Sequence, residues 1–156
     1  MSYSRLEMKV TNRIIVFDID GTLSNLMHRR HLVETKPKDW KAFNDGMAND
    51  EPHDDVTDLL KMFASNGYLI VLCTGRDADY RQTTIDWLDK HGIPHDALYM
   101  RTSKDRRDDS IIKVELLAEI RKDFGEPWLW FDDRNRVVDA VRAAGVRVMQ
   151  VAPGDF

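Results

Sequence analysis

Apolar segments and segments of helical periodicity alternate along this chain of 156 residues, and this alternation constrains the fold more than any other feature. The apolar segments predict strands at residues 13–19, 68–73, 97–100, 128–131 and 146–151, and the periodic segments predict helices at 56–66, 79–91, 111–124 and 135–144. Strands that are apolar on both faces and alternate with helices are typical of a parallel sheet covered on both sides. The pattern therefore predicts a three-layer α/β fold, a doubly wound parallel sheet of about five strands.

The length and composition favour one globular domain, residues 1–156. No apolar run approaches the roughly 18 residues of a membrane helix, and the first residues, MSYSRLEMK, contain no apolar signal-peptide core. We therefore expect a cytoplasmic protein without membrane contact. Cys73 is the only cysteine, which excludes an intramolecular disulfide. The net charge of −4 gives no global attraction to nucleic acid, so a polyanion would need a local basic patch.

One segment, about residues 24–54, interrupts the alternation. It is polar, contains Pro37 and Pro52, and is too long for a plain connection. Trp40 and Phe43 predict a short helix with a small apolar side, and we expect Trp40 to belong to the core of this segment rather than to stack on a base. We interpret the segment as a small cap inserted after the first strand.

Polar residues follow three of the predicted strands. Asp18 and Asp20 end the first, Thr74, Gly75 and Arg76 end the second, and Asp132 and Asp133 end the fourth. Ligands of parallel sheets bind at the carboxyl ends of the strands, so these residues are expected at one edge. Any one aspartate pair could be an ordinary turn or helix cap, but three charged strand ends at one edge favour a site.

The residue types at this edge suit phosphate chemistry. Two adjacent carboxylates can supply a nucleophile and a general acid/base. Four acids at one edge repel each other unless a cation lies among them, and Mg²⁺ is the hard cation that carboxylates prefer. Thr74 and Arg76 can donate hydrogen bonds to phosphate oxygens. Lys113 is either a solvated lysine or a fixed positive charge that holds a phosphate.

Four motifs together resemble those of the haloacid dehalogenase (HAD) phosphatases: "DIDGT" from Asp18, the threonine of "VLCTGR", Lys113 and "FDD" from Phe131. The resemblance spans the chain from about residue 13 and implies a Rossmann-like HAD fold. It implies that Asp18 is a nucleophile that forms an aspartyl-phosphate, and that Asp20 protonates the leaving oxygen and then activates water. It also implies catalytic roles for Thr74 and Lys113, and Mg²⁺ held by Asp18, the Asp20 backbone carbonyl, Asp132 and Asp133.

Two further stretches, "MRTSKDRRDDSIIK" (residues 100–113) and "QVAPGDF" (residues 150–156), are similar to the 3′-phosphatase domain of bacteriophage-type polynucleotide kinase-phosphatases. This similarity implies substrate-handling residues, which are Arg29, Gly75, Arg76, Arg101, Asp109 and Lys113. Asp109 and Lys113 are four apart, so on a helix the acid can orient the lysine.

The chain departs from that family at three points. It has no "GxxxxGK[ST]" phosphate-binding loop, so no kinase activity is expected. Lys104 stands where relatives carry glycine. The cap matches least, which leaves two substrate classes open. One is the 3′-phosphate of DNA or RNA ends, favoured by basic patches at residues 28–31 and 101–107 and by a cap short enough to leave the site open. The other is a nucleoside monophosphate or another small metabolite.

Two other classes of protein fit less well. A phosphoryl-accepting receiver domain would carry an aspartate after the third strand, and Tyr99-Met100-Arg101 contains none. A binding scaffold without activity would be expected to lose at least one residue of the four motifs, and all are present.

Overall fold

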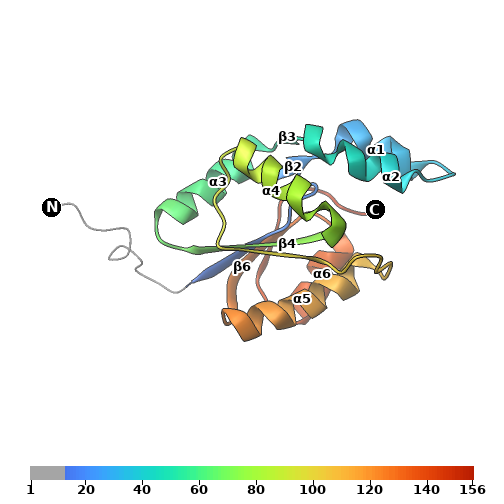
Figure 1. The fold of residues 1–156 in the computed structure, drawn as a ribbon. Helices are drawn as coiled ribbons and strands as arrows, with labels where there is room; N and C mark the ends of the chain where they lie inside the picture. Colours follow the sequence, from blue (N-terminus) through green and yellow to red (C-terminus); the bar gives the residue numbers. More distant parts are fainter. Residues whose placement is uncertain (1–12) are drawn as a thin grey trace.

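The computed structural model describes residues 13–156. The prediction that the first residues form no signal peptide concerns a segment outside this described part. Its centre is a five-stranded sheet in the order β5-β4-β1-β6-β7, in which every neighbouring pair is parallel (Figure 1). The strands are β1 Ile14–Phe17, β4 Leu69–Asp77, β5 Ala97–Arg101, β6 Pro127–Asp132 and β7 Val148–Gln150. The predicted parallel sheet is confirmed.

Helices cover both faces of the sheet, with α3 and α4 on one side and α5 and α6 on the other (Figure 1). Their bounds are α3 Asp54–Ser65, α4 Arg81–Lys90, α5 Asp109–Asp123 and α6 Asn135–Ala143. Alternate side chains of β1 enter the two layers: Ile15 and Phe17 pack with Leu60 and Trp87, whereas Val16 packs with the α5 and α6 side chains. Because both faces are buried, β1 is a continuous apolar run rather than an alternating one.

Several predicted boundaries are wrong by a few residues. Strand β4 continues to Asp77, so the polar residues expected after the strand lie within it. Helix α5 begins at Asp109 rather than at residue 111, because the Asp108 carboxylate accepts a hydrogen bond from the Ser110 backbone N–H and starts the helix earlier. The helix expected over 79–91 is divided into a 3₁₀ turn, Ala78–Tyr80, and α4.

Residues 24–53, here called the insertion, lie between β1 and α3. They form the antiparallel pair β2 (Ser24–Asn25) and β3 (Glu51–Pro52), helices α1 (Met27–Glu34) and α2 (Trp40–Asp45), and the 3₁₀ turn Gly46–Asn49. The sequence predicts one short helix here, and the structure contains two. The insertion lies on the α4 side, beyond the carboxyl ends of the strands (Figure 1). None of the helices in residues 13–156 is long and apolar enough to cross a membrane.

Candidate active site

Asp18 is fixed at the carboxyl end of β1. The chain turns sharply after it, with the backbone N–H groups of Leu23 and Ser24 both donating to the Ile19 carbonyl. This turn brings Thr22 Oγ1 to 2.9 Å from Asp18 Oδ2, while Lys113 Nζ lies 2.7 Å from Asp18 Oδ1. Asp18 is 3% exposed, so one hydroxyl and one ammonium orient a carboxylate that solvent hardly reaches.

Asp18, Asp132 and Asp133 form an acidic triad, whose nearest ligand atoms all lie within 4.8 Å of one another. Burial and the carboxylate of Asp132 raise the pKa of Asp18 well above its usual range, and the same two causes raise the pKa of Asp133 to about 6. Three ionised carboxylates beside the single ammonium of Lys113 would leave a surplus of two negative charges. The donor set therefore fits a hard divalent cation.

Lys113 links this triad to α5. Its Nζ lies 2.8 Å from Asp132 Oδ2 and 3.8 Å from Asp109 Oδ2, and the residue is 1% exposed. Burial alone would lower the pKa of Lys113, but Asp132 and Asp18 raise it well above its usual value. Lys113 is thus a buried ammonium and not the solvated lysine that the sequence left open.

Asp20 has a different environment, outside the triad. Arg76 Nη2 and Arg29 Nη2 each lie 2.7 Å from Asp20 Oδ1, and Arg76 Nε is 3.1 Å from both carboxylate oxygens. Burial alone would raise the pKa of Asp20, but the guanidinium groups of Arg76 and Arg29 hold it well below its usual range. The structure therefore holds Asp20 as a carboxylate.

Asp50 is a site residue that the sequence analysis missed. It is buried, and it accepts hydrogen bonds from Arg29 Nε at 2.8 Å and Arg29 Nη2 at 2.7 Å. Arg29, also buried, packs its guanidinium 4.3 Å from the centroid of the Phe43 ring. Asp50 belongs to no motif, and only the need of a buried arginine for a paired acid could have pointed to it.

The end of β4 is packed tightly against the start of α5. A side chain on Gly75 would overlap the Asp109 carboxylate, and Thr74 Oγ1 accepts a hydrogen bond from the Arg76 backbone N–H. Arg101 donates to the backbone carbonyls of Gly75, Asp105 and Arg107, and its Nη2 lies 3.3 Å from Asp109 Oδ1. Arg101 thus orders the loop at residues 102–108.

Lys104 has a φ of +65°, and its backbone N–H donates to Asp77 Oδ2 at 2.8 Å. Positive φ favours glycine. The loop therefore has a left-handed backbone conformation at a residue that carries a side chain.

The C-terminal residues cross the end of the sheet next to the triad. The Gly154 carbonyl accepts from the Asn135 backbone N–H at 2.7 Å, and a side chain on Gly154 would overlap the backbone of Asp133. The Phe156 ring then lies between two guanidinium groups, 4.4 Å from that of Arg30 in α1 and 4.9 Å from that of Arg134. This aromatic side chain connects the insertion to the body of the sheet.

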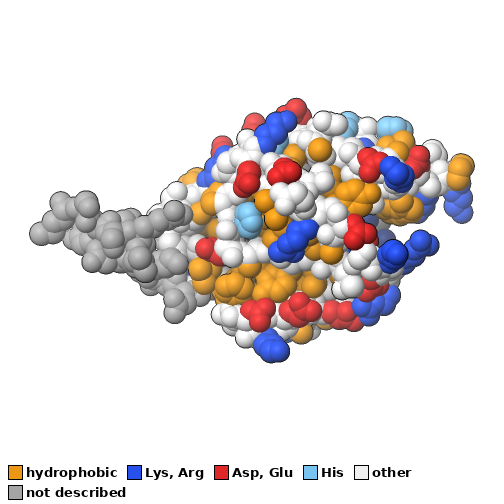
Figure 2. Space-filling model, viewed as in Figure 1, with side chains coloured by type: hydrophobic (Ala, Val, Ile, Leu, Met, Phe, Trp, Pro, Cys, Tyr) orange, Lys and Arg blue, Asp and Glu red, His pale blue; other side chains and the backbone are white. Residues whose placement is uncertain are grey.

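These elements enclose a cleft of about 780 Å³. Its lining includes most of the expected site residues, namely Asp18, Asp20, Gly75, Arg76, Arg101, Asp109, Lys113, Asp132 and Asp133, whereas Arg29 and Thr74 are buried behind it. Basic residues of the insertion, Arg30 and Lys38, face Lys104, Arg106 and Arg134 across it. Figure 2 shows the indentation at the right of the molecule, with lysine and arginine side chains on both sides.

Comparison with known proteins identifies one family and several solved structures with the same fold. The family described as polynucleotide kinase PNKP phosphatase domain matches residues 12–156. A chain in the structure of a Pnkp1/Rnl/Hen1 complex is 34% identical with a TM-score of 0.78, over 94% of this chain and 48% of that one, so this chain spans about half its length. A Class C acid phosphatase from Bacillus anthracis, solved with tungstate bound, is 19% identical with a TM-score of 0.64, over 96% and 70% of the two chains. The haloacid dehalogenase-like protein SP0104 from Streptococcus pneumoniae is 15% identical with a TM-score of 0.62, over 88% and 83%. The last two share the fold.

Proposed function

Because the chain belongs to the PNKP phosphatase family of HAD-type phosphomonoesterases, we propose that it removes 3′-phosphates from the ends of DNA or RNA. The observation that carries the proposal is the buried Asp18 carboxylate, 2.7 Å from Lys113 Nζ, at the base of an open cleft with a basic rim. A carboxylate nucleophile is ionised at neutral pH once its charge is balanced, and a fixed ammonium favours the negative charge of a phosphoryl group beside it.

In the proposed mechanism, an Asp18 oxygen attacks phosphorus. The new bond forms as the bond from phosphorus to the 3′ oxygen breaks, which leaves an aspartyl-phosphate on Asp18. Lys113, which lines the cleft, donates to a phosphoryl oxygen. Asp20 gives a proton to the leaving 3′ oxygen, then takes one from the water that hydrolyses the intermediate and releases phosphate.

Asp20 is held as a carboxylate in the structure, so it must gain a proton before it can act as an acid. The dianionic phosphate of the substrate supplies a reason. It competes with Asp20 for the Arg76 guanidinium and adds negative charge nearby, and both effects raise the pKa of Asp20. Arg29 and Asp50 are then positioning residues that keep Arg76 and Asp20 in register.

We propose that Mg²⁺ is held by the acidic triad and the Asp20 backbone carbonyl. When bound, the cation would neutralise charge on the phosphoryl oxygens. The fit rests on three buried carboxylates whose surplus of negative charge Lys113 alone does not balance.

The insertion is proposed to act as a small cap. It forms one wall of the cleft, which is partly open to solvent, and a partly open cleft suits a polymer end better than a small molecule that a closed lid would enclose. The basic rim, with Arg106 and Lys104 opposite Lys38, gives a negative backbone a favourable path although the net charge is −4.

The experiment that tests this function is phosphate release, with and without Mg²⁺, from an oligonucleotide with a 3′-phosphate and from the same oligonucleotide with a 5′-phosphate. Nucleoside monophosphates are assayed alongside. Mg²⁺-dependent release from the 3′ end alone is the expected result. Faster release from free nucleotides would assign the site to nucleotide hydrolysis, and release from neither would overturn both functions.

A further inference from the structure

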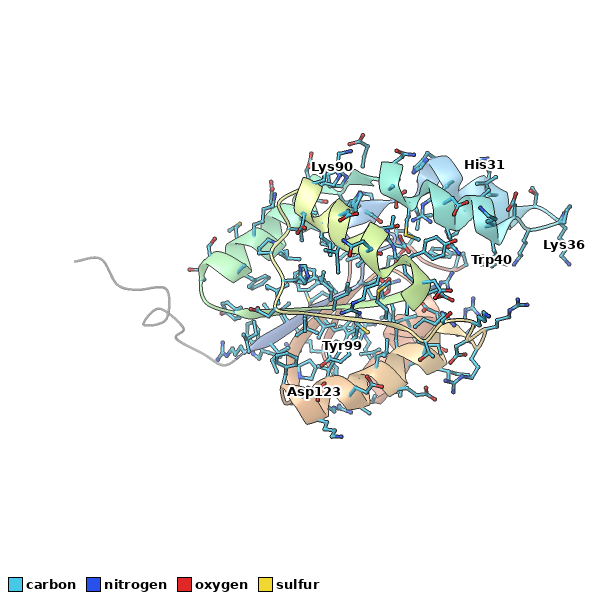
Figure 3. The ribbon with its side chains drawn as sticks, in the orientation of Figure 1. His31, Lys36, Trp40, Lys90, Tyr99 and Asp123 are labelled. Carbon is cyan, nitrogen blue, oxygen red and sulfur yellow. The ribbon has the colours of Figure 1, made fainter. Side chains whose placement is uncertain are left out.

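Trp40 is exposed at the surface of the insertion, so the prediction that it belongs to the core of this segment is wrong. Its side chain is 54% exposed at the start of α2, and it lines the same cleft as Asp18 and Asp20. Figure 3 shows it on the side of the insertion that faces the loop before α5. Among the large exposed apolar side chains of residues 13–156, Trp40 is the one that lines the cleft; Met27, Met62, Ile111, Phe124, Trp128 and Met149 do not.

The ring is held in place by its neighbours. Phe43 contacts it edge to face, with ring centroids 5.7 Å apart at 88°, and Asp39 caps α2 by accepting from the Ala42 backbone N–H at 2.9 Å. Phe43 in turn packs under the Arg29 guanidinium, which is bonded to Asp20. A continuous series of contacts therefore sets the distance between the exposed indole and the carboxylate that is proposed to protonate the leaving group.

The chemistry around the ring indicates what it binds. Lys38 Nζ lies 5.6 Å from the centroid of the Trp40 ring, and Arg30, Lys104 and Arg106 line the same cleft. An exposed aromatic ring among cations is the combination that binds single-stranded nucleic acid, because bases stack on the ring and the cations contact the phosphates. An apolar peptide segment would gain nothing from these cations.

We propose that Trp40 is a stacking platform for the base of the terminal nucleoside, the one that carries the 3′-phosphate. This inference rests on the proposed function and names the group that fixes the leaving alcohol in the cleft. Stacking does not depend on which base is present, so the platform selects nucleosides over simple alcohols without reading sequence. Trp40 is therefore a residue that determines specificity, and it takes no part in the bond changes.

The test compares Trp40→Ala and Trp40→Phe with the unchanged chain. The substrates are a 3′-phosphorylated oligonucleotide, the same oligonucleotide with an abasic terminal nucleoside, and glycerol phosphate, which has no ring. We expect Trp40→Ala to lower kcat/KM on the first by about tenfold, mainly through KM, and to leave the other two within about twofold. Trp40→Phe should retain most of the activity, because a smaller ring still stacks.

Trp128→Ala is the matched control. Trp128 is 41% exposed at the start of β6, at the end of the sheet opposite the cleft. Its replacement by alanine should therefore leave the rates on all three substrates unchanged. Equal losses by Trp40→Ala on the oligonucleotides with and without the terminal base would overturn the platform, because the ring would then act on the fold of the insertion. No loss of activity on any substrate would also overturn the platform, and a contact with a protein partner would then be the remaining role for the exposed indole.

Failure of the proposed function can be told apart from failure of the platform. If the unchanged chain hydrolyses nucleoside monophosphates and not 3′-phosphorylated ends, the proposed function fails. The platform is then tested with a nucleoside monophosphate against the corresponding ribose phosphate. Trp40→Ala should remove the preference for the nucleoside, and an unchanged preference would overturn the platform.

Discussion

Asp18 and Asp20 are two residues apart, yet their surroundings oppose each other. Burial and the Asp132 carboxylate raise the pKa of Asp18 although the Lys113 ammonium lowers it. The guanidinium groups of Arg76 and Arg29 lower the pKa of Asp20 although its burial raises it. The turn after β1 produces the difference, because it directs one side chain to α5 and β6 and the other to the insertion and β4. One strand end can thereby supply both a nucleophile and a separate proton carrier.

Asp18→Asn should lower kcat by roughly 10⁴-fold or more, because an amide is a poor nucleophile towards phosphorus. The fold should persist, since the change removes one of three buried carboxylates that repel each other. Single-turnover phosphate release and a thermal melt check both points. Retained turnover would exclude Asp18 as the nucleophile.

Asp50→Ala should lower the free energy of unfolding by about 3 kcal/mol, because it leaves the buried Arg29 guanidinium without its two-point partner. Urea denaturation measures the change. Asp45→Ala is the control, since Asp45 lies in the same insertion but pairs with Lys41 at the surface and should give no measurable change. Equal stability of the two variants would contradict the role of the Arg29–Asp50 pair.

At the residue scale, the sequence predicts the aspartates at the ends of β1 and β6 because each pair comes directly after an apolar run. The sequence leaves open whether Lys113 is a solvated lysine or a fixed charge of the site. The fold decides this, because it buries Lys113 beside the acidic triad. Asp50 and the exposed position of Trp40 could not be predicted, since both depend on how the insertion packs against the sheet. The polar sequence of the insertion has no hydrophobic periodicity from which this packing could be predicted.

Among the elements, β4 and β5 hold the loop at residues 102–108 through the side chains at their ends. Arg101 donates to two of its carbonyls, and Asp77 accepts from Lys104. Sequence reasoning identifies the strands and helices on either side because periodicity defines them, but it misplaces ends where a side-chain cap or a strand extension decides, as at Asp108 and Asp77.

Lys104→Gly should stabilise the protein by about 0.5–1 kcal/mol. Glycine removes the free-energy cost of a left-handed conformation at a residue with a side chain. Part of this gain is lost, because glycine also has more conformational entropy in the unfolded chain. Urea denaturation is again the measurement. Lys104→Ala is the comparison, because it removes the charge and keeps the strained φ, so it should give no such gain. Stabilisation by alanine alone would contradict the backbone argument.

For the whole molecule, charge is distributed unevenly: the net charge is −4, while lysines and arginines face each other across the cleft. We expect kcat/KM on a 3′-phosphorylated oligonucleotide to fall about five- to tenfold between 50 and 200 mM salt, as for about two phosphate contacts. Glycerol phosphate should show a weaker dependence. Identical salt dependence for both substrates would mean that the rim does not contact the polymer.

Mg²⁺ should also stabilise the molecule as a whole. Binding at 100 times its dissociation constant would add about 2.7 kcal/mol to the free energy of unfolding, or roughly 5–10 °C in Tm. A thermal melt with and without Mg²⁺ measures this without any substrate. Asp133→Asn should reduce the shift, because Asp133 belongs to the acidic triad. No shift at millimolar Mg²⁺ would contradict a metal held by the triad.

The position of Phe156 between the arginines of α1 and the triad loop has a practical consequence for tethering. A reporter, affinity tag or second protein fused after Phe156 would emerge at the mouth of the cleft and compete with an entering strand. One fused ahead of β1 would emerge from the opposite end of the sheet, because β1 begins at the end away from the insertion (Figure 1). A surface on which the molecule is immobilised should therefore hold it by its N-terminal side.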